Sequence, residues 1–231
     1  MIEVRAAAAR GRANFGWLDS KHTFSFGHYY DPAHMGFSEL RVINDDQVTP
    51  GAGFDTHGHR DMEIISYVLE GTIAHKDSAG NVKTLPAGEF QLMSAGRGIR
   101  HSEFNASDSD TLKFLQIWIQ PNTPGGEPGY QQKDFGQDPG LTTIATPNGE
   151  NGTLHIKQDA KLHQLILLPG TDLHLDVAPG RRIYIHQIDS ELIVNDVMLT
   201  PGDGAKISGE SELQLRNASD VAVKALVFDL P

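Results

Sequence analysis

The segment that decides the fold is residues 51–105, which contains the two short motifs His57-Gly58-His59 and His101-Ser102-Glu103. Successive side chains of a β-strand point to opposite faces of a sheet, so residues i and i+2 project to the same side. Each motif therefore aims two metal-ligating side chains at one face. If the two strands face each other across a barrel, three imidazoles and one carboxylate converge, and such a set is typical of a divalent transition metal.

The pattern around these motifs predicts strands and turns rather than helices. Residues 63–69 form an apolar run rich in β-branched residues, and residues 112–119 are nearly apolar on both faces, as in a central strand. Residues 72–85 predict a hairpin, because two short strands flank a connection rich in turn formers. Residues 37–43 predict a further strand, ended by a turn at residues 44–46. No segment has a convincing helical period longer than two turns, so we expect an all-β protein.

The composition changes after the first half of the chain. Residues 121–140 are rich in proline and glycine and poor in aliphatic residues, which predicts a linker. Short alternating strands then resume and weakly repeat the order of the first half. We expect a metal-binding domain at residues 1–120 and a degenerate domain without metal at residues 141–231. The histidines of this second half have no partner two residues away; they are His155, His163, His174 and His186.

Length and charge limit the classes of protein that fit. The 231 residues, 39% of them hydrophobic, can fill one large or two small cores. The net charge of −11, without any basic run longer than Arg181-Arg182, gives no footprint for nucleic acid. The absence of cysteine removes disulfides and thiolate ligands and is compatible with a reducing cytosol. No apolar stretch approaches the roughly 20 residues of a membrane helix. We expect a cytoplasmic protein without nucleic-acid or membrane partners.

Two segments are similar to the two sequence motifs of the cupin superfamily. Residues 51–71 resemble the first motif through Gly51, His57, His59, Glu63 and Gly71, and residues 98–105 resemble the end of the second through Gly98, His101 and Asn105. Two spacings depart from the usual pattern. Gly71 follows Glu63 by one residue more than usual, and the Pro86-Ala87-Gly88 turn lies further from His101 than in typical cupins.

More specifically, the chain resembles the pirin family, most strongly over residues 14–119. The segments that carry the likeness are residues 24–26, 30–37, 40–46, 57–63 and 98–103. The resemblance implies a bicupin, with two tandem jelly-roll β-barrels and metal only in the N-terminal one. It also maps the metal ligands, which are His57, His59, His101 and Glu103.

The likeness is close to bacterial pirin-like proteins that act as quercetinases. It therefore implies a metal-dependent quercetin 2,3-dioxygenase, which cleaves a flavonol with O2 and releases carbon monoxide. Glu103 is the candidate catalytic base for the substrate's 3-hydroxyl, because a base must lie within hydrogen-bond reach of the proton that it removes. Without thiolate ligands, iron, nickel, manganese, cobalt, copper and zinc all stay possible.

Two other functions stay open at this point. The first is a non-catalytic metal-sensing and redox-sensing module that contacts a regulatory protein, since vertebrate pirins are associated with transcription-factor binding. The second is an isomerase or hydrolase that uses the metal only as a Lewis acid. An enzyme predicts an apolar and aromatic pocket over the metal, whereas a binding module predicts an exposed patch near a shielded metal. The aromatic arm at residues 24–30 could line such a pocket or pack on the barrel.

Several further polar residues near the motifs have weaker signals. Glu63 keeps the carboxylate position of the first cupin motif, but the resemblance gives the fourth ligand position to Glu103, so we expect Glu63 to support a ligand. His75 lies outside both motifs and is predicted to be a polar strand residue. His22 has no partner at a ligand spacing and is expected to be structural or exposed. Three arginines could form a solvated rim or contact substrate: Arg60, Arg97 and Arg100.

Overall fold

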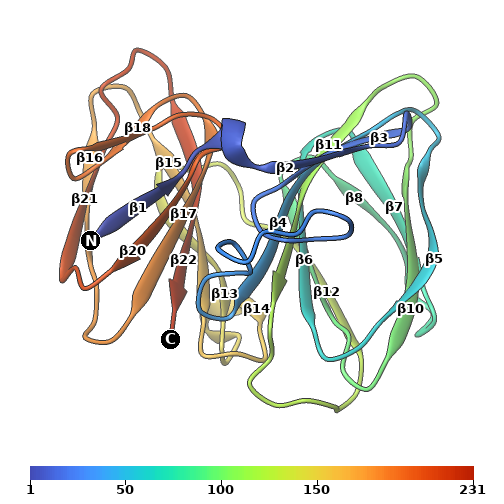
Figure 1. Ribbon diagram of the computed structural model, residues 1–231. Coiled ribbons are helices and arrows are strands. Elements are labelled where there is room, and N and C mark those ends of the chain that lie inside the picture. The colour runs from blue at the N-terminus through green and yellow to red at the C-terminus, as the bar shows by residue number, and fades with distance from the viewer. The chain divides into compact units, whose positions relative to one another are not determined.

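Nearly every element of the computed structural model, which describes residues 1–231, is a β-strand (Figure 1). The two helical segments are single 3-10 turns, η1 (Ala7–Ala9) and η2 (Glu150–Gly152). The predicted all-β class is therefore confirmed. No helix in the structure has the length and apolar character that crossing a membrane would require.

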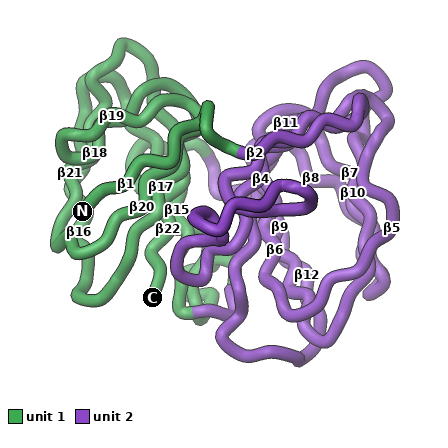
Figure 2. Tube along the Cα trace, viewed as in Figure 1, with its two compact units in different colours: residues 1–10, 137–155, 159–231 green, residues 11–136, 156–158 purple.

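The chain divides into two compact units (Figure 2). Unit 2 comprises residues 11–136 and 156–158, and unit 1 comprises residues 1–10, 137–155 and 159–231. These units exchange short segments that the expected boundaries did not include. The first ten residues join the second half of the chain, because strand β1 pairs with strand β20 along its whole length. Backbone hydrogen bonds between segments about two hundred residues apart leave no local signal in the sequence.

Unit 2 consists of two antiparallel sheets. The larger has the strand order β12-β9-β6-β11-β4-β3-β2, and the smaller has the order β5-β10-β7-β8. The bounds of the strands are β2 (Gly11–Asn14), β3 (Leu18–His22), β4 (Leu40–Val48), β5 (Gly53–His59), β6 (Glu63–Glu70), β7 (Thr72–Asp77), β8 (Val82–Pro86), β9 (Glu89–Ser94), β10 (Ile99–Asn105), β11 (Leu112–Ile119) and β12 (Gly129–Asp134).

Unit 1 repeats this plan with seven and four strands. Its sheets have the orders β1-β20-β17-β22-β15-β13-β14 and β16-β21-β18-β19. The predicted pair of cupin-type barrels is thus confirmed. The bounds are β1 (Ile2–Arg5), β13 (Gly140–Thr146), β14 (Leu154–His155), β15 (Lys161–Leu167), β16 (Asp172–Asp176), β17 (Arg182–Asp189), β18 (Leu192–Val194), β19 (Val197–Leu199), β20 (Gly204–Ser208), β21 (Glu212–Arg216) and β22 (Val223–Leu230).

Two local predictions in unit 2 were wrong. The expected turn at residues 44–46 lies inside β4, because Asn44 and Asp46 point into the barrel and bond there to side chains of other strands. These partners replace the local hydrogen bonds by which Asn and Asp favour turns. The expected linker at residues 121–140 contains β12, which pairs with β9 over six residues. Its prolines and glycines mostly flank a segment, residues 130–134, that contains neither.

Other local predictions are confirmed. Strands β7 and β8 form the expected hairpin, and β11 is central, with β4 on one side and β6 on the other. The interior of unit 2 alternates between apolar and polar layers along these strands. On β6, Ser66 lies between Val68 and Ile64, which belong to separate apolar clusters. On β11, Gln116 has the same position between Phe114 and Trp118. A polar layer therefore separates two apolar ends of the barrel.

Candidate metal centre

The two ligand motifs lie side by side on neighbouring strands, β5 and β10, rather than across the barrel from each other. His101 is directly opposite His57, and Ile99 is opposite His59. The register then shifts between His101 and Glu103, so that Glu103 is opposite Phe54. Such an irregularity re-aims side chains on a strand. In the structure both motifs therefore lie in the same sheet, on two paired strands.

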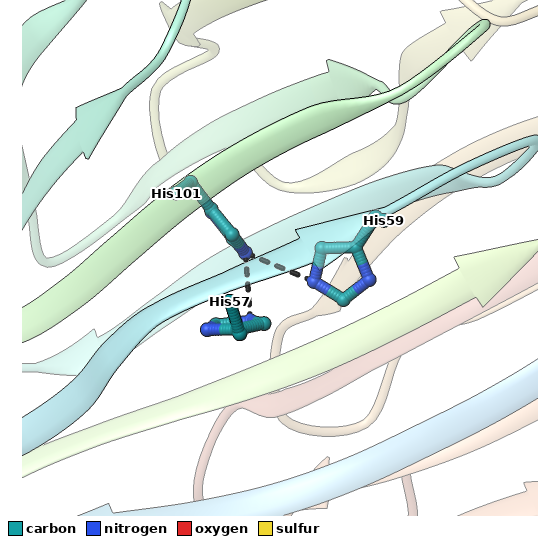
Figure 3. A group of neighbouring side chains, drawn as sticks. All are labelled: His57, His59 and His101. Carbon is teal, nitrogen blue, oxygen red and sulfur yellow. Dashed lines mark hydrogen bonds between the residues drawn. The ribbon is translucent and has the colours of Figure 1, made fainter.

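The three histidines form one tight group (Figure 3). Nε2 of His101 lies 3.0 Å from Nε2 of His57 and 3.0 Å from Nε2 of His59. Two ligand atoms about 2.1 Å from one ion and at right angles to each other are about 3.0 Å apart. The two short separations from His101, with all three nitrogens within 4.8 Å of one another, therefore fit an ion between them. One proton cannot satisfy both contacts of His101, so hydrogen bonding alone does not account for the group.

The protonation of these imidazoles also suits a metal. Burial lowers the pKa of His101 to about 3 and that of His59 to about 4, with the neighbouring His57 as a further cause for both. Both rings are thus neutral at pH 7, and neutral imidazole is the form that binds metal. Nδ1 of His57 lies 2.7 Å from the carbonyl oxygen of Asp55. Donation from this nitrogen leaves Nε2 of His57 with a free lone pair.

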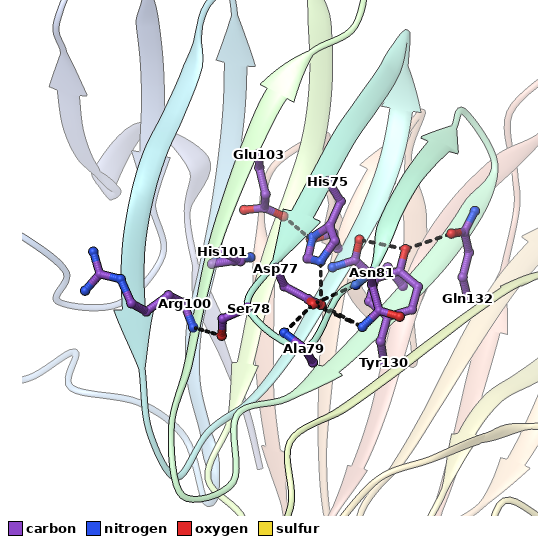
Figure 4. A network of polar contacts seen from close by, with 12 residues as sticks. His75, Asp77, Ser78, Ala79, Asn81, Arg100, His101, Glu103, Tyr130 and Gln132 are labelled. Carbon is purple, nitrogen blue, oxygen red and sulfur yellow. Dashed lines mark hydrogen bonds and ion pairs between the residues drawn. The ribbon is translucent and has the colours of Figure 1, made fainter.

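Glu103 lies in a second group of possible ligands, which shares His101 with the first and adds His75 (Figure 4). The side chain is buried, and its Oε1 accepts a hydrogen bond of 3.2 Å from the Ser66 hydroxyl. Burial raises the pKa of Glu103 to about 7, and the bond from Ser66 opposes this shift. A cation beside this carboxyl would favour its charged form. The assignment of Glu103 as fourth ligand stays a prediction.

His75 is the residue of this region that sequence reasoning missed. It is 1% exposed, and its Nε2 lies 3.0 Å from Oδ2 of Asp77. Asp77 also accepts bonds from Asn81 and from the backbone of Ala79 (Figure 4). Although burial opposes the change, the hydrogen bonds from His75 and Asn81 lower the pKa of Asp77. The spacing His75-x-Asp77 on β7 is the same i, i+2 signal that identified the two ligand motifs.

Glu63 and the arginines take structural positions. Oε2 of Glu63 accepts bonds from the Ser94 hydroxyl at 2.9 Å and from the backbone N–H of Lys157 at 3.1 Å. It thereby ties the segment at residues 156–158 to the barrel, and it belongs to neither ligand group. Arg97 forms an exposed ion pair with Glu127, and Arg100 donates to a backbone carbonyl at the surface. The exposed positions of Arg97 and Arg100 agree with a solvated rim, which is one of the two roles considered for them.

A cavity of about 490 Å³ opens beside the histidine group. Its size is in the range of small-molecule sites. Part of the aromatic arm lines it, while Phe24 is buried in the core and Tyr30 is exposed. The aromatic lining is Phe15, Phe26, Tyr29, Phe54 and Trp118, and the polar lining includes Ser20, His22, Asn44, Asp46 and Gln116, next to His57 and His59. This is the apolar and aromatic pocket that the enzyme hypothesis predicted.

Asp46 gives a testable pH dependence of stability. Burial is the main cause that raises its pKa to about 7, whereas the unfolded value is about 3.9. Its contribution to stability is therefore complete below about pH 4 and is lost as the pH rises through about 7. We expect the free energy of unfolding of metal-free Asp46→Asn to increase relative to that of the wild type across this interval, by at most about 4 kcal/mol. Thermal unfolding from pH 4 to 8 measures it.

Asp45→Asn is the matched control for this experiment, because Asp45 is the neighbouring residue on β4 and is less buried than Asp46. Its difference from the wild type should not grow across the same interval. A constant difference between Asp46→Asn and the wild type from pH 4 to 8 would contradict the raised pKa.

Comparison with known proteins adds to this geometry. Residues 3–119 match the family described as Pirin, and residues 143–230 match the family described as Quercetinase C-terminal cupin domain. The fold and these two matches define a bicupin, with the histidine group in the barrel formed by the first half of the chain. The chain belongs to the pirin family, as the resemblance of its motifs predicted.

Relatives of high identity extend over the whole chain. The quercetin 2,3-dioxygenase of Escherichia coli strain K12 is 48% identical over 100% of this chain and 99% of its own length. The pirin-like protein of Caulobacter vibrioides is 39% identical over 95% of this chain and 96% of its own. The crystal structure of the bacterial pirin YhhW from Escherichia coli in complex with nickel(II) matches with a TM-score of 0.97 and 47% identity, covering 100% of this chain and 99% of that one. The prediction of an enzyme agrees with the name of the first relative.

Proposed function

We propose that this chain is a metal-dependent dioxygenase that cleaves a flavonol such as quercetin with O2 and releases carbon monoxide. The observation that carries the proposal is the aromatic cavity of about 490 Å³, which ends on His57 and His59. A planar polyphenol fits such walls, since aromatic rings attract each other in stacked and edge-to-face arrangements. The quercetin 2,3-dioxygenase named among the relatives supports the same substrate class.

His57, His59 and His101 would hold one divalent transition metal, with Glu103 as the fourth ligand. When bound, the metal supplies Lewis acidity toward a substrate hydroxyl and, if redox-active, a route for electrons to O2. The relative YhhW forms a complex with nickel(II), so nickel is one candidate among the six metals that the ligand types allow. The imidazoles of His59 and His101, whose pKa values burial lowers, are neutral and so prepared for ligation in the absence of the ion.

Glu103 is the proposed base. Its Oε1 is held by the Ser66 hydroxyl, which leaves Oε2 for a proton from the substrate's 3-hydroxyl. A bound metal would lower the pKa of Glu103 below its metal-free value of about 7, so it would act as a modest base. Aromatic side chains form much of the wall of the cavity that ends on His57 and His59. Trp118 makes edge-to-face contacts with Phe26 at 5.3 Å and with His59 at 5.0 Å between ring centroids, so the wall is continuous with the histidine group.

We also propose that the second barrel holds no metal. Its histidines have other environments, which supports a degenerate domain. Nδ1 of His163 lies 3.1 Å from the Thr143 hydroxyl, and His174 is exposed beside Asp172. His155 is exposed and His186 is buried, on different strands. We keep residues 1–120 and 141–231 as the proposed functional domains, with the exchanged segments described above.

The test is turnover of quercetin by metal-stripped protein that is reloaded separately with iron, nickel, manganese, cobalt, copper or zinc. Carbon monoxide release under oxygen is the readout, and metal content is measured in each sample. We expect turnover with redox-capable metals and little with zinc, which cannot change its oxidation state. Binding of every metal without turnover by any would contradict the dioxygenase proposal. The metal-sensing module that contacts a regulatory protein would then be the hypothesis to pursue.

A further inference from the structure

Polar side chains from three adjacent strands line the cavity next to the histidine group. They come from β3, β4 and β11 and are Ser20, His22, Asn44, Asp46 and Gln116. Strand register sets their positions, because Ser20 is opposite Asp46, and Asn44 lies between His22 and Gln116. Each is at most 7% exposed. These side chains therefore form a floor of the cavity rather than a solvated rim.

Most polar atoms of this floor satisfy one another. Nδ1 of His22 lies 2.8 Å from Oδ1 of Asn44, and Gln116 donates to Oδ2 of Asp46 at 3.1 Å. Oδ1 of Asp46 is the exception, because it is buried and has no hydrogen-bond partner of good geometry. Against the larger effect of burial, which raises the pKa of the Asp46 carboxyl, the Ser20 hydroxyl on the opposite strand still lowers it. A buried polar atom without a partner is costly and uncommon in folded proteins. A hydrogen-bond donor that enters the cavity would supply this partner.

The surroundings of Asp46 indicate what this group is. A carboxylate oxygen accepts hydrogen bonds, so the entering group is a donor. The walls are largely aromatic, with Phe26, Phe54 and Trp118 among them, so the donor belongs to a planar aromatic molecule. A positively charged donor is less suitable there, because the cavity also contains the imidazoles that would hold a cation. A phenolic hydroxyl meets all of these conditions.

We propose that Asp46 is a specificity residue, whose Oδ1 accepts a hydrogen bond from a phenolic hydroxyl of the ligand other than the hydroxyl that meets the metal. The inference rests on the proposed function for its ligand class and adds a second point of recognition to it. Gln116 orients the carboxyl by holding Oδ2. A flavonol would thus be held at two places, by the histidine group and by the floor of the cavity.

The test measures binding of flavonols without oxygen, so that no turnover is needed. The probes are quercetin, kaempferol, galangin and fisetin, which share the 3-hydroxyl and differ in their other hydroxyls. Quenching of the tryptophan fluorescence, to which Trp118 in the cavity wall contributes together with Trp17, reports binding to the nickel-loaded protein at pH 8, above the pKa of Asp46. For at least one pair of these flavonols, we expect the wild type to prefer the member with the extra hydroxyl by about tenfold to a hundredfold.

Asp46→Asn should remove this preference, because Gln116 holds the amide oxygen and the amide N–H2 then replaces the accepting oxygen. Asp45→Asn should keep it. Equal preferences in Asp46→Asn and the wild type for every pair would overturn the proposal, as would a wild type that discriminates between none of them. Failure of the wild type to bind any flavonol would overturn the proposed function together with this inference. If the wild type binds flavonols but does not turn them over in air, only the proposed activity would be contradicted.

Discussion

His101→Ala is expected to remove metal binding almost completely. His101 belongs to both groups of possible ligands, and its Nε2 contacts those of His57 and His59. Its loss therefore breaks the three-histidine group and separates Glu103 from it. Removal of a residue that only supports a ligand costs about 10-fold to 100-fold in metal affinity, so loss of the shared ligand should cost more than about 100-fold. Equilibrium dialysis against nickel(II), followed by elemental analysis, measures the change.

His174→Ala is the matched control, because His174 is an exposed histidine of unit 1. It should bind as much metal as the wild type. Thermal unfolding of both variants shows whether the barrel is intact, since His101 is buried on β10 and its truncation leaves a space. A folded His101→Ala that retains one metal per chain would disprove the ligand assignment.

The candidate site could be predicted from sequence where its geometry is local. The i, i+2 rule fixes the facing of His57 with His59 and of His101 with Glu103, because it depends only on the pleat of one strand. Which strands become neighbours depends on pairing over long distances in the sequence. The two motifs were expected across a barrel, yet β5 and β10 are adjacent in one sheet. The sequence thus predicted that the histidines converge, but it predicted strands that face each other across a barrel rather than neighbours in one sheet.

Residues outside the motifs were harder to assign for the same reason. His75 and Asp77 approach the site only because β7 pairs with β10, with His75 opposite Glu103 and Asp77 opposite His101. Asp46 was assigned to a turn, since Asp favours turns when its partners are local. Its actual partner, Gln116, follows 70 residues later in the chain. The polar floor of the cavity therefore had no local signature.

The strand β12 shows the same limit in the fold. The prolines and glycines correctly predicted irregular backbone near residues 121–129. They also led to the prediction of a linker where the short strand β12 follows. Tyr130 and Gln132 on this strand are joined by a hydrogen bond of 2.7 Å, and the Tyr130 ring lies 4.9 Å from that of His75. The supposed linker thus contributes to the surroundings of the candidate metal centre.

Glu103→Gln is expected to lower the rate of carbon monoxide release by about 10²-fold to 10⁴-fold, the usual contribution of a general base. Glutamine has nearly the same size as glutamate and can keep the bond from Ser66, so the barrel should stay folded. It cannot take the proton of the substrate hydroxyl. Because three histidines remain, the variant should still bind metal, although less tightly, and saturating metal must be present in the assay.

Glu63→Gln separates this effect from the loss of any buried carboxylate. Glu63 is also buried, but it contacts Ser94 and the backbone of Lys157 and belongs to neither ligand group. Its substitution should change stability more than turnover. If metal-loaded Glu103→Gln releases carbon monoxide as fast as Glu63→Gln, the proton must go to another acceptor, and Asp46 on the cavity floor is then the next carboxyl to test. Slow turnover confined to Glu103→Gln would support the base assignment.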